Sequence, residues 1–193
     1  MSNGGLRERK KRRTRDAIQD AALHLYREQG YAQTTLEQVA AVADVSPSTL
    51  FRYFPSKPDT VLYDRVDPIV IDAILAQPEE LTPLEAVRAA LRAVVDGLDT
   101  DAATLEATRA TLMAQVPELR AAAAQKVEED LPQFIEAIAQ RTGREADDPQ
   151  VQYWVGALAG VALMAYWRAM SQGQDIYTTV DEALDFLADG ISL

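Results

Sequence analysis

The sequence predicts an all-α protein of about nine helices, in which an N-terminal three-helix head precedes a helical body. Apolar residues recur at three- to four-residue spacing over long stretches, which is typical of amphipathic helices. No stretch alternates apolar and polar residues as a half-buried strand does. The 193 residues are 48% apolar and 25% charged, which is the composition of a folded globular chain and not of a disordered one.

The head is expected to begin with a helix from Arg13 to Gln29, which Gly30 ends. Its inward face would be formed by apolar residues at helical spacing, namely Ile18, Ala22 and Leu25. Two short helices follow over residues 35–43 and 47–54, and a longer fourth helix begins after Ser56 and reaches Ala76. We expect the head to cover residues 1–58 and the body residues 59–193, with no flexible linker between them.

The body is expected to contain five further helices. Proline-containing breaks separate its periodic stretches, which cover residues 84–98, 105–116, 118–141, 149–171 and 180–191. Pro132 lies inside the third of these helices and should kink or split it, because proline cannot donate the internal backbone hydrogen bond.

Residues 34–54 contain two helix starts separated by a very short connection. Thr34 and Glu37 fit a capping box at the first start. Ser46 fits the cap of the second start, with Pro47 at the first helical position, where its missing N–H costs nothing.

Only Asp44 and Val45 remain for the turn between these two helices. So tight a turn requires a residue that tolerates left-handed backbone, and Asp does so better than most. The contacts that lock the helices together would come from apolar residues, Val39, Ala40, Ala43, Val45 and Leu50. The pattern therefore predicts a helix-turn-helix, whose second helix lies in the DNA major groove.

The outward residues of the 47–54 helix suit DNA contact. Side chains at its N-terminal end would reach base edges, and these are Ser46, Pro47, Ser48 and Thr49. Arg52, Tyr53 and Lys57 would supply donors for the phosphates. Lys57 would also open the fourth helix after the Ser56 cap, with Asp59 completing a second capping box.

The charge is distributed unevenly along the chain. The net charge of −11 alone argues against a nucleic-acid partner, but residues 1–58 carry +4 and residues 59–193 carry −15. Seven cations lie within nine positions, namely Arg7, Arg9, Lys10, Lys11, Arg12, Arg13 and Arg15. This asymmetry indicates one end that binds polyanions. A solvated disordered tail or a targeting signal is the alternative.

The same residues carry a family resemblance. Thr34-Thr35 with Val39-Ala40, followed by Val45-Ser46-x-x-Thr49-Leu50-Phe51-x-Tyr53-Phe54-Pro55-Ser56-Lys57, resembles the N-terminal signature of tetracycline-repressor (TetR) type regulators. The match covers residues 13–64, and the remaining chain is similar only in length and predicted helices. Asp44 replaces the usual turn glycine, and Phe51 replaces an aromatic residue that usually carries a hydroxyl.

The resemblance implies a DNA-binding transcription regulator, a repressor that binds a palindromic operator as a homodimer and is released by a small-molecule ligand in the body. It places at the DNA Thr35, Ser46, Pro47, Ser48, Thr49, Phe51, Tyr53 and Lys57. A ligand-independent, architectural DNA-binding protein is the alternative, and it predicts weak sequence preference.

The body helix from Val151 to Met170 is apolar on two opposite faces and must be buried on both. One face would pack on its own chain and the other on a second copy, where Gly156 and Gly160 would permit close approach beside Leu163. By the same family analogy, Leu184 and Leu187 on the last helix would complete the interface. A core helix buried within one chain is the alternative.

A ligand pocket in the body would be lined by Arg109, Met113, Phe134, Trp154, Met164 and Trp167. Plain core packing is the alternative for the apolar members. Arg109 would meet an anionic ligand or form a surface salt bridge, and His24 is expected to be a surface residue.

Other functional classes find no support in the sequence. The chain has no cysteine and one histidine, which excludes a thiolate nucleophile, zinc sites with sulfur ligands and a His-rich metal centre. No nucleophile elbow, phosphate loop or metal-binding helix appears, so we expect no enzyme activity, metal or cofactor. The most apolar run, Trp154 to Trp167, is shorter than the ~20 residues that a bilayer requires, and no signal peptide is evident. We therefore expect a cytoplasmic protein with no membrane partner.

Overall fold

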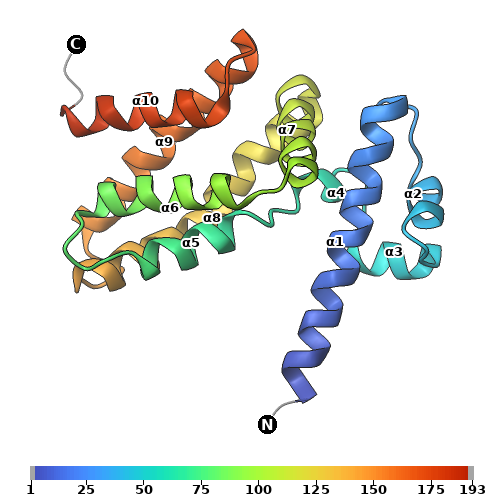
Figure 1. Cartoon of the computed structure of the whole chain (residues 1–193), viewed down its shortest axis with the longest axis horizontal. Coiled ribbons are helices and arrows are strands. Elements are labelled where there is room, and N and C mark those ends of the chain that lie inside the picture. The colour runs from blue at the N-terminus through green and yellow to red at the C-terminus, as the bar shows by residue number, and fades with distance from the viewer. Residues whose placement is uncertain (1–2, 191–193) are drawn as a thin grey trace. The chain divides into compact units, whose positions relative to one another are not determined.

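The computed structural model describes the backbone of residues 3–190 and side chains from residue 5 on (Figure 1). This part of the chain contains helices and no strand, which confirms the predicted all-α class. Its helices are α1 (Asn3–Gln29), α2 (Leu36–Val42), α3 (Pro47–Tyr53), α4 (Asp59–Leu62), α5 (Asp67–Ala76), α6 (Pro83–Gly97), α7 (Thr100–Gln115), α8 (Pro117–Thr142), α9 (Pro149–Gln172) and α10 (Ile176–Ala188). Ile191, expected in the last helix, lies outside the described residues.

Contacts between helices divide the chain into two units. The first unit runs to Tyr63 and includes Thr100–Arg120, so α7, which the sequence assigned to the body, packs on α1 and α4. The second unit comprises Asp64–Asp99 and the chain from Ala121 on. Helix α8 begins in the first unit and continues into the second.

Helix α1 begins ten residues earlier than predicted, at Asn3 instead of Arg13. Its early turns consist largely of Lys and Arg, which have high helix propensity but show no apolar period that could have revealed them. Further along, Ile18 and Ala22 are buried as expected, whereas Leu25 is half-buried and Leu23 is buried in its place. This face forms the core of the first unit with Val39, Leu50, Phe54 and Val61.

The predicted fourth helix is in fact two helices, α4 and α5. Asp64 lies between them, and its Oδ1 accepts hydrogen bonds from the backbone N–H groups of Val66 (2.7 Å) and Asp67 (2.9 Å). A side chain that takes backbone donors competes with the helix ladder in this way. The start of α4 is also later than predicted. The backbone N–H and Oγ of Ser56 donate to the Asp59 carboxylate (2.8 and 2.7 Å), but the helix begins only at Asp59.

Helix α4 is held by side chains from α1 and α7. The buried amide of Gln19 donates to the carbonyl oxygens of Thr60 (3.1 Å) and Tyr63 (2.7 Å). The Arg109 guanidinium donates through Nε to the carbonyl oxygen of Val61 (3.0 Å). The last carbonyl groups of a helix have no partner within it, so these two side chains satisfy groups that a four-residue helix cannot.

The second unit packs α5, α6, α8, α9 and α10 around one apolar core. Its buried residues include Val70, Ile74, Ala90, Val94, Ile138, Val155 and Leu184. Pro132 was predicted to kink or split its helix; α8 is continuous through Pro132, so it is not split. The Arg141 guanidinium closes the α5–α6 connection by donating to the carbonyl oxygens of Gln77 (3.0 Å) and Leu81 (3.0 Å), among others.

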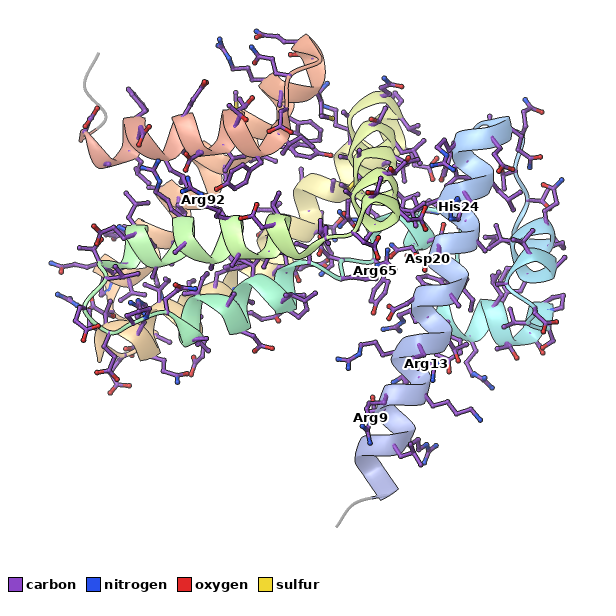
Figure 2. The ribbon with its side chains drawn as sticks, in the orientation of Figure 1. Arg9, Arg13, Asp20, His24, Arg65 and Arg92 are labelled. Atoms are coloured by element: carbon purple, nitrogen blue, oxygen red, sulfur yellow. The ribbon has the colours of Figure 1, made fainter. Side chains whose placement is uncertain are left out.

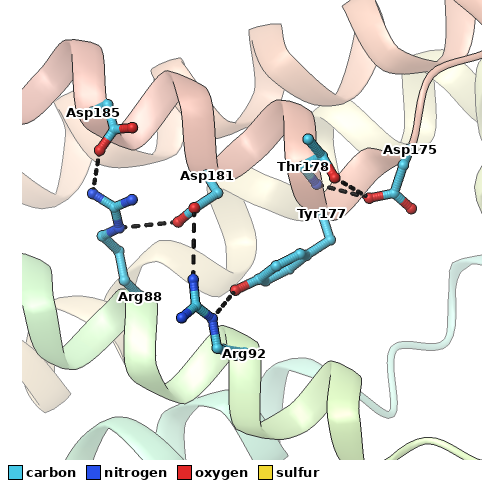
Figure 3. A network of polar contacts seen from close by, with 7 residues as sticks. All are labelled: Arg88, Arg92, Asp175, Tyr177, Thr178, Asp181 and Asp185. Atoms are coloured by element: carbon cyan, nitrogen blue, oxygen red, sulfur yellow. Dashed lines mark hydrogen bonds and ion pairs between the residues drawn. The ribbon is translucent and has the colours of Figure 1, made fainter.

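A polar network joins α6 to α10 (Figure 3). Arg88 Nε lies 2.9 Å from the Asp181 carboxylate, and the other end of the same guanidinium contacts Asp185. One turn further along α6, Arg92 Nε donates to the Tyr177 hydroxyl (3.0 Å). Hydrogen bonds to the Asp181 and Asp185 carboxylates raise the pKa of Arg88 above its ordinary value. The polar network as a whole fixes which face of α10 lies against α6.

None of the described helices is long and apolar enough to cross a membrane.

Candidate nucleic-acid interface

Helices α2 and α3 meet at a tight corner centred on Asp44. Asp44 adopts a left-handed conformation with φ of +52°, as the two-residue turn requires. The Val45 N–H donates to the Ala40 carbonyl oxygen (3.0 Å) and closes the corner. Val39, Ala40 and Leu50 are buried between the helices. The predicted corner and most of its locking contacts are therefore present in the structure.

The capping box at the start of α2 is one residue later than predicted. Thr35 Oγ1 accepts from the Gln38 N–H (3.2 Å), and Gln38 Oε1 accepts from the Thr35 N–H (2.8 Å). Thr34 is instead buried, and its hydroxyl donates to the Gly30 carbonyl oxygen (2.9 Å). The predicted Thr34–Glu37 box is therefore wrong, because burial of Thr34 leaves the cap to its neighbour.

The cap of α3 is the predicted Ser46. Its Oγ accepts from the Thr49 N–H (3.2 Å) and also lies 3.0 Å from Ser48 Oγ and 2.9 Å from Thr49 Oγ1. The three hydroxyl groups thus form one connected cluster at the beginning of the helix. This cluster fixes the first turn of α3, and both Ser46 and Ser48 remain exposed on it.

The rest of α3 separates into a buried and an exposed side. Leu50 faces the core, whereas Pro47, Ser48, Phe51 and Arg52 are exposed. Phe51 retains 43% of its surface, so a large part of its ring meets solvent. The helix therefore presents an outward surface of mixed hydroxyl, apolar and cationic groups.

The end of α3 is anchored to α1 by arginine and aromatic rings. The Arg15 guanidinium lies 4.9 Å from the ring centroid of Tyr63 and 6.0 Å from those of Tyr53 and Phe54. The Arg52 guanidinium also lies over the Tyr53 ring, 5.4 Å from its centroid. The sequence predicts Arg15 only as a member of the basic arm. Its packing role could not be predicted, because the rings that it contacts are distant in sequence.

Lys57 is bound within its own unit. Its ammonium group donates to the Tyr31 carbonyl oxygen and lies 4.3 Å from the Tyr31 ring and 5.7 Å from the Tyr26 ring. Burial lowers the pKa of Lys57, and the nearby Glu118 carboxylate partly offsets this. Lys57 thus braces the α1–α2 connection, a role that the sequence did not suggest. Phosphate contact by Lys57 stays a prediction.

The remaining basic residues of the arm lie on helix α1. Arg7, Arg9, Lys10, Lys11, Arg12 and Arg13 are all exposed on the first turns of α1, where Figure 2 labels Arg9 and Arg13. No residue from Gly5 to Ala17 is buried. This segment is a helical extension carrying cations on all sides. Thr35, at the cap of α2, is exposed as well.

The predicted pocket residues are divided between the two units. Arg109 and Met113 lie buried on α7. Arg109 contacts α4 and lies 3.4 Å from the Glu106 carboxylate. Because Arg109 is buried, this ion pair is not the surface salt bridge that was the alternative. Phe134 and Trp154 are half-buried against the core of the second unit, and the Trp167 ring lies 4.8 Å from that of Tyr166. Met164 is 67% exposed. His24 is half-buried, with Nε2 3.8 Å from the Asp101 carboxylate.

The two predicted faces of α9 differ in burial. Val151, Val155 and Leu158 lie in the core, whereas Gly156 and Gly160 on the opposite face are exposed, with Leu163 half-buried beside them. Leu184 on α10 is 1% exposed within its own chain, and Leu187 packs against the same core. Including Leu184 in a dimer interface was therefore wrong, because it has no surface left to bury.

Comparison with known proteins identifies the family. The family model described as "Bacterial regulatory proteins, tetR family" matches residues 18–61, and that of the "MftR C-terminal domain" matches residues 81–192. The HTH-type transcriptional regulator TcmR of Streptomyces glaucescens is 34% identical over 195 residues, which cover 95% of this chain and 86% of TcmR. The chain belongs to the tetR family. It is a transcriptional regulator with a DNA-binding helix-turn-helix, as its motif predicted.

Solved structures of tetR-type proteins share the fold. FadR of Thermus thermophilus, a TetR family transcriptional repressor in complex with lauroyl-CoA, superposes with a TM-score of 0.59 and 22% identity over 93% of this chain and 95% of FadR. SmeT of Stenotrophomonas maltophilia in complex with triclosan gives a TM-score of 0.59 and 22% identity over 93% of this chain and 94% of SmeT. The all-α fold of this chain is therefore one that solved tetR-type structures share.

Replacing Asp44 tests whether the corner requires left-handed backbone at this residue. At φ of +52°, Asp44→Gly relieves strain, whereas Asp44→Ala keeps a Cβ and has no side chain that tolerates this conformation. We expect the alanine variant to be less stable than the glycine variant by about 1 kcal/mol in urea unfolding. Equal stability of the two variants would show that the corner does not require left-handed backbone.

Replacing Lys57 tests its bracing role. Lys57→Met keeps the stem but removes the ammonium group from the Tyr31 carbonyl and the two rings, so we expect a loss of about 1–2 kcal/mol in urea unfolding. Lys11→Met, on the exposed extension of α1, is the matched control and should leave stability unchanged. If both variants unfold like the native protein, Lys57 braces nothing.

Proposed function

We propose that this tetR-family regulator is a repressor that binds a palindromic operator as a homodimer and releases it when a small molecule binds. The observation that carries the proposal is the outward surface of α3, where Ser48, Phe51 and Arg52 are exposed on a helix whose opposite side is locked to α2. A helix held in this way can enter the major groove without rearrangement of its own unit.

Phosphate contacts would come from around this surface. The exposed cations of the α1 extension lie in the same unit as α3, and the exposed caps Thr35 and Ser46 begin α2 and α3. Such contacts neutralise phosphates without reading sequence. Ser48, Thr49 and Phe51 would face the bases, with Pro47 and Tyr53 at the edges of the contact. Arg52, which the sequence placed at a phosphate, lies on the same side of α3 as Ser48 and is therefore assigned to a base edge. Lys57 would reach a phosphate only by leaving the Tyr31 carbonyl.

A dimer interface is supported by the exposed face of α9. Tyr153 is 76% exposed and Met164 67%, and Gly156 and Gly160 lie between them on the same side of the helix. An exposed apolar stripe of this length is expected to be covered by a partner. Because Gly156 and Gly160 have no side chains, a second α9 could approach this stripe closely, with Leu163 at its margin. Two copies place two recognition helices on one operator, since one short helix buries too little surface for a specific site.

Release by a ligand is supported by two structural neighbours, FadR with lauroyl-CoA and SmeT with triclosan. In this chain the half-buried Phe134, Trp154 and Trp167 of the second unit would supply apolar contacts to such a molecule. The ligand would act only through a different affinity for the DNA-binding and the released state. This function requires no catalysis, and it places the protein in the cytoplasm, where bacterial DNA lies.

Selection of bound DNA from random fragments tests the proposal. We expect the full chain to enrich a palindrome whose half-sites are centred about one helical turn apart, because two related α3 helices must enter successive major grooves. An architectural protein would enrich fragments without a shared sequence, and that result would contradict the proposal. Repression and release are then measured by transcription from a promoter that carries the palindrome.

A single substitution tests the interface. Gly160→Arg places a long side chain in the exposed stripe of α9, where a Cβ meets no neighbouring atom within its own chain. We expect the variant to fold but to sediment as a monomer and to lose operator affinity at least tenfold. Gly97→Arg, on an exposed helical glycine of α6 with equally open surroundings, is the matched control. A Gly160→Arg variant that is still dimeric would place the interface elsewhere.

A further inference from the structure

We propose that Phe51 contacts the 5-methyl group of a thymine in each operator half-site and so determines part of the sequence that the protein recognises. The inference rests on the proposed function, since it concerns how the same α3 surface discriminates between bases. The exposed aromatic ring of Phe51 is its starting point.

Phe51 exposes a large part of its ring beside the core of its own unit. Its side chain keeps 43% of its surface, although α3 lies next to a well-buried core that takes Leu50 and Phe54. Among the described residues the ring and cation contacts at this end of the head involve Tyr53, Phe54 and Tyr63, and Phe51 takes part in none of them. A large apolar side chain left in water is unfavourable, so a partner that covers it gains affinity.

The surroundings of Phe51 are apolar on one side and polar on the other. Pro47, also exposed, lies four residues earlier and therefore on the same side of the helix. Ser48 and Arg52 form the next stripe, and the Ser48 hydroxyl lies within hydrogen-bond distance of Ser46. The Arg52 guanidinium lies over the Tyr53 ring. Pro47 and Phe51 thus make an apolar strip along one edge of the recognition surface.

The chemistry of the major groove leaves one occupant for such a strip. The base edges there present hydrogen-bond donors and acceptors, and the thymine C5-methyl group is their apolar feature. Phe51 has no hydroxyl, so it cannot donate to a phosphate oxygen. Contact with a donor or acceptor would instead leave that group without water or a partner, which is costly. Thymine is therefore the base that the strip favours.

Replacement of thymine by deoxyuridine in the selected operator removes this methyl group and nothing else. We expect one thymine position per half-site at which the change weakens binding by the native protein about fourfold for each half-site, as expected for one buried methyl group. Phe51→Ala should bind the natural operator more weakly and be insensitive to deoxyuridine at that position. Phe51→Tyr, which keeps the ring, should remain sensitive.

Val42→Ala is the matched control. Val42 is another exposed apolar residue of the helix-turn-helix, at 58%, but it lies on α2. Its removal should leave the deoxyuridine effect intact. Urea unfolding of each variant ensures that altered binding is not a loss of fold, and Phe51→Leu serves as a second variant if Phe51→Ala is unstable; it should retain only part of the effect.

Three outcomes overturn the inference. If the native protein binds its palindrome specifically but no thymine shows a methyl dependence, the proposed function stands and the role of Phe51 falls. The same holds if Phe51→Ala retains the full methyl dependence. If no sequence is enriched at all, the proposed function fails first and the inference falls with it.

Discussion

The outward surface of α3 depends on the left-handed backbone at Asp44. With φ of +52° at this one residue, the chain reverses within two positions, and Leu50 can bury its side chain against Val39 and Ala40. A longer connection would leave α3 free to rotate, and its exposed side would no longer be defined. The Ser46 cap then fixes the first turn of the helix. The exposure of Ser48, Phe51 and Arg52 follows from these constraints together.

The cations of the first unit differ in whether they contact their own chain or are exposed to solvent. Arg15 and Lys57 lie over aromatic rings, where they hold α1 to the end of α3 and to the α1–α2 connection. Arg109 and the neutral Gln19 satisfy the carbonyl groups of the short helix α4. Among the described residues of this unit, a run of exposed cations lies on the extension of α1 alone. The count of basic residues near the N-terminus therefore overstates how many are available to phosphates, and the position of each in the fold decides its use.

Local patterns were sufficient for the all-α class, most helices, the corner and the Ser46 cap, because periodicity and capping depend on neighbouring residues. Four features were not predicted in this way. Thr34 and Thr35 both fit a cap, and only the burial of Thr34 decides between them. The apolar stripe of α10 fits a partner as well as its own core, and Leu184 proves to lie in the core. Asp64 interrupts the predicted fourth helix through its side chain, and the partners of Arg15 and Lys57 are distant in sequence. The candidate DNA surface was thus outlined from the sequence, but the packing that supports it was not.

The most direct measurement of the central claim is a structure of the protein bound to its selected DNA. The account predicts that α3 lies in the major groove with Phe51 and Arg52 toward the base edges, that the helical extension of α1 follows the sugar-phosphate backbone, and that two copies related by twofold symmetry occupy successive turns. A complex in which the exposed side of α3 faces solvent, while another surface of the chain meets the DNA, would contradict it.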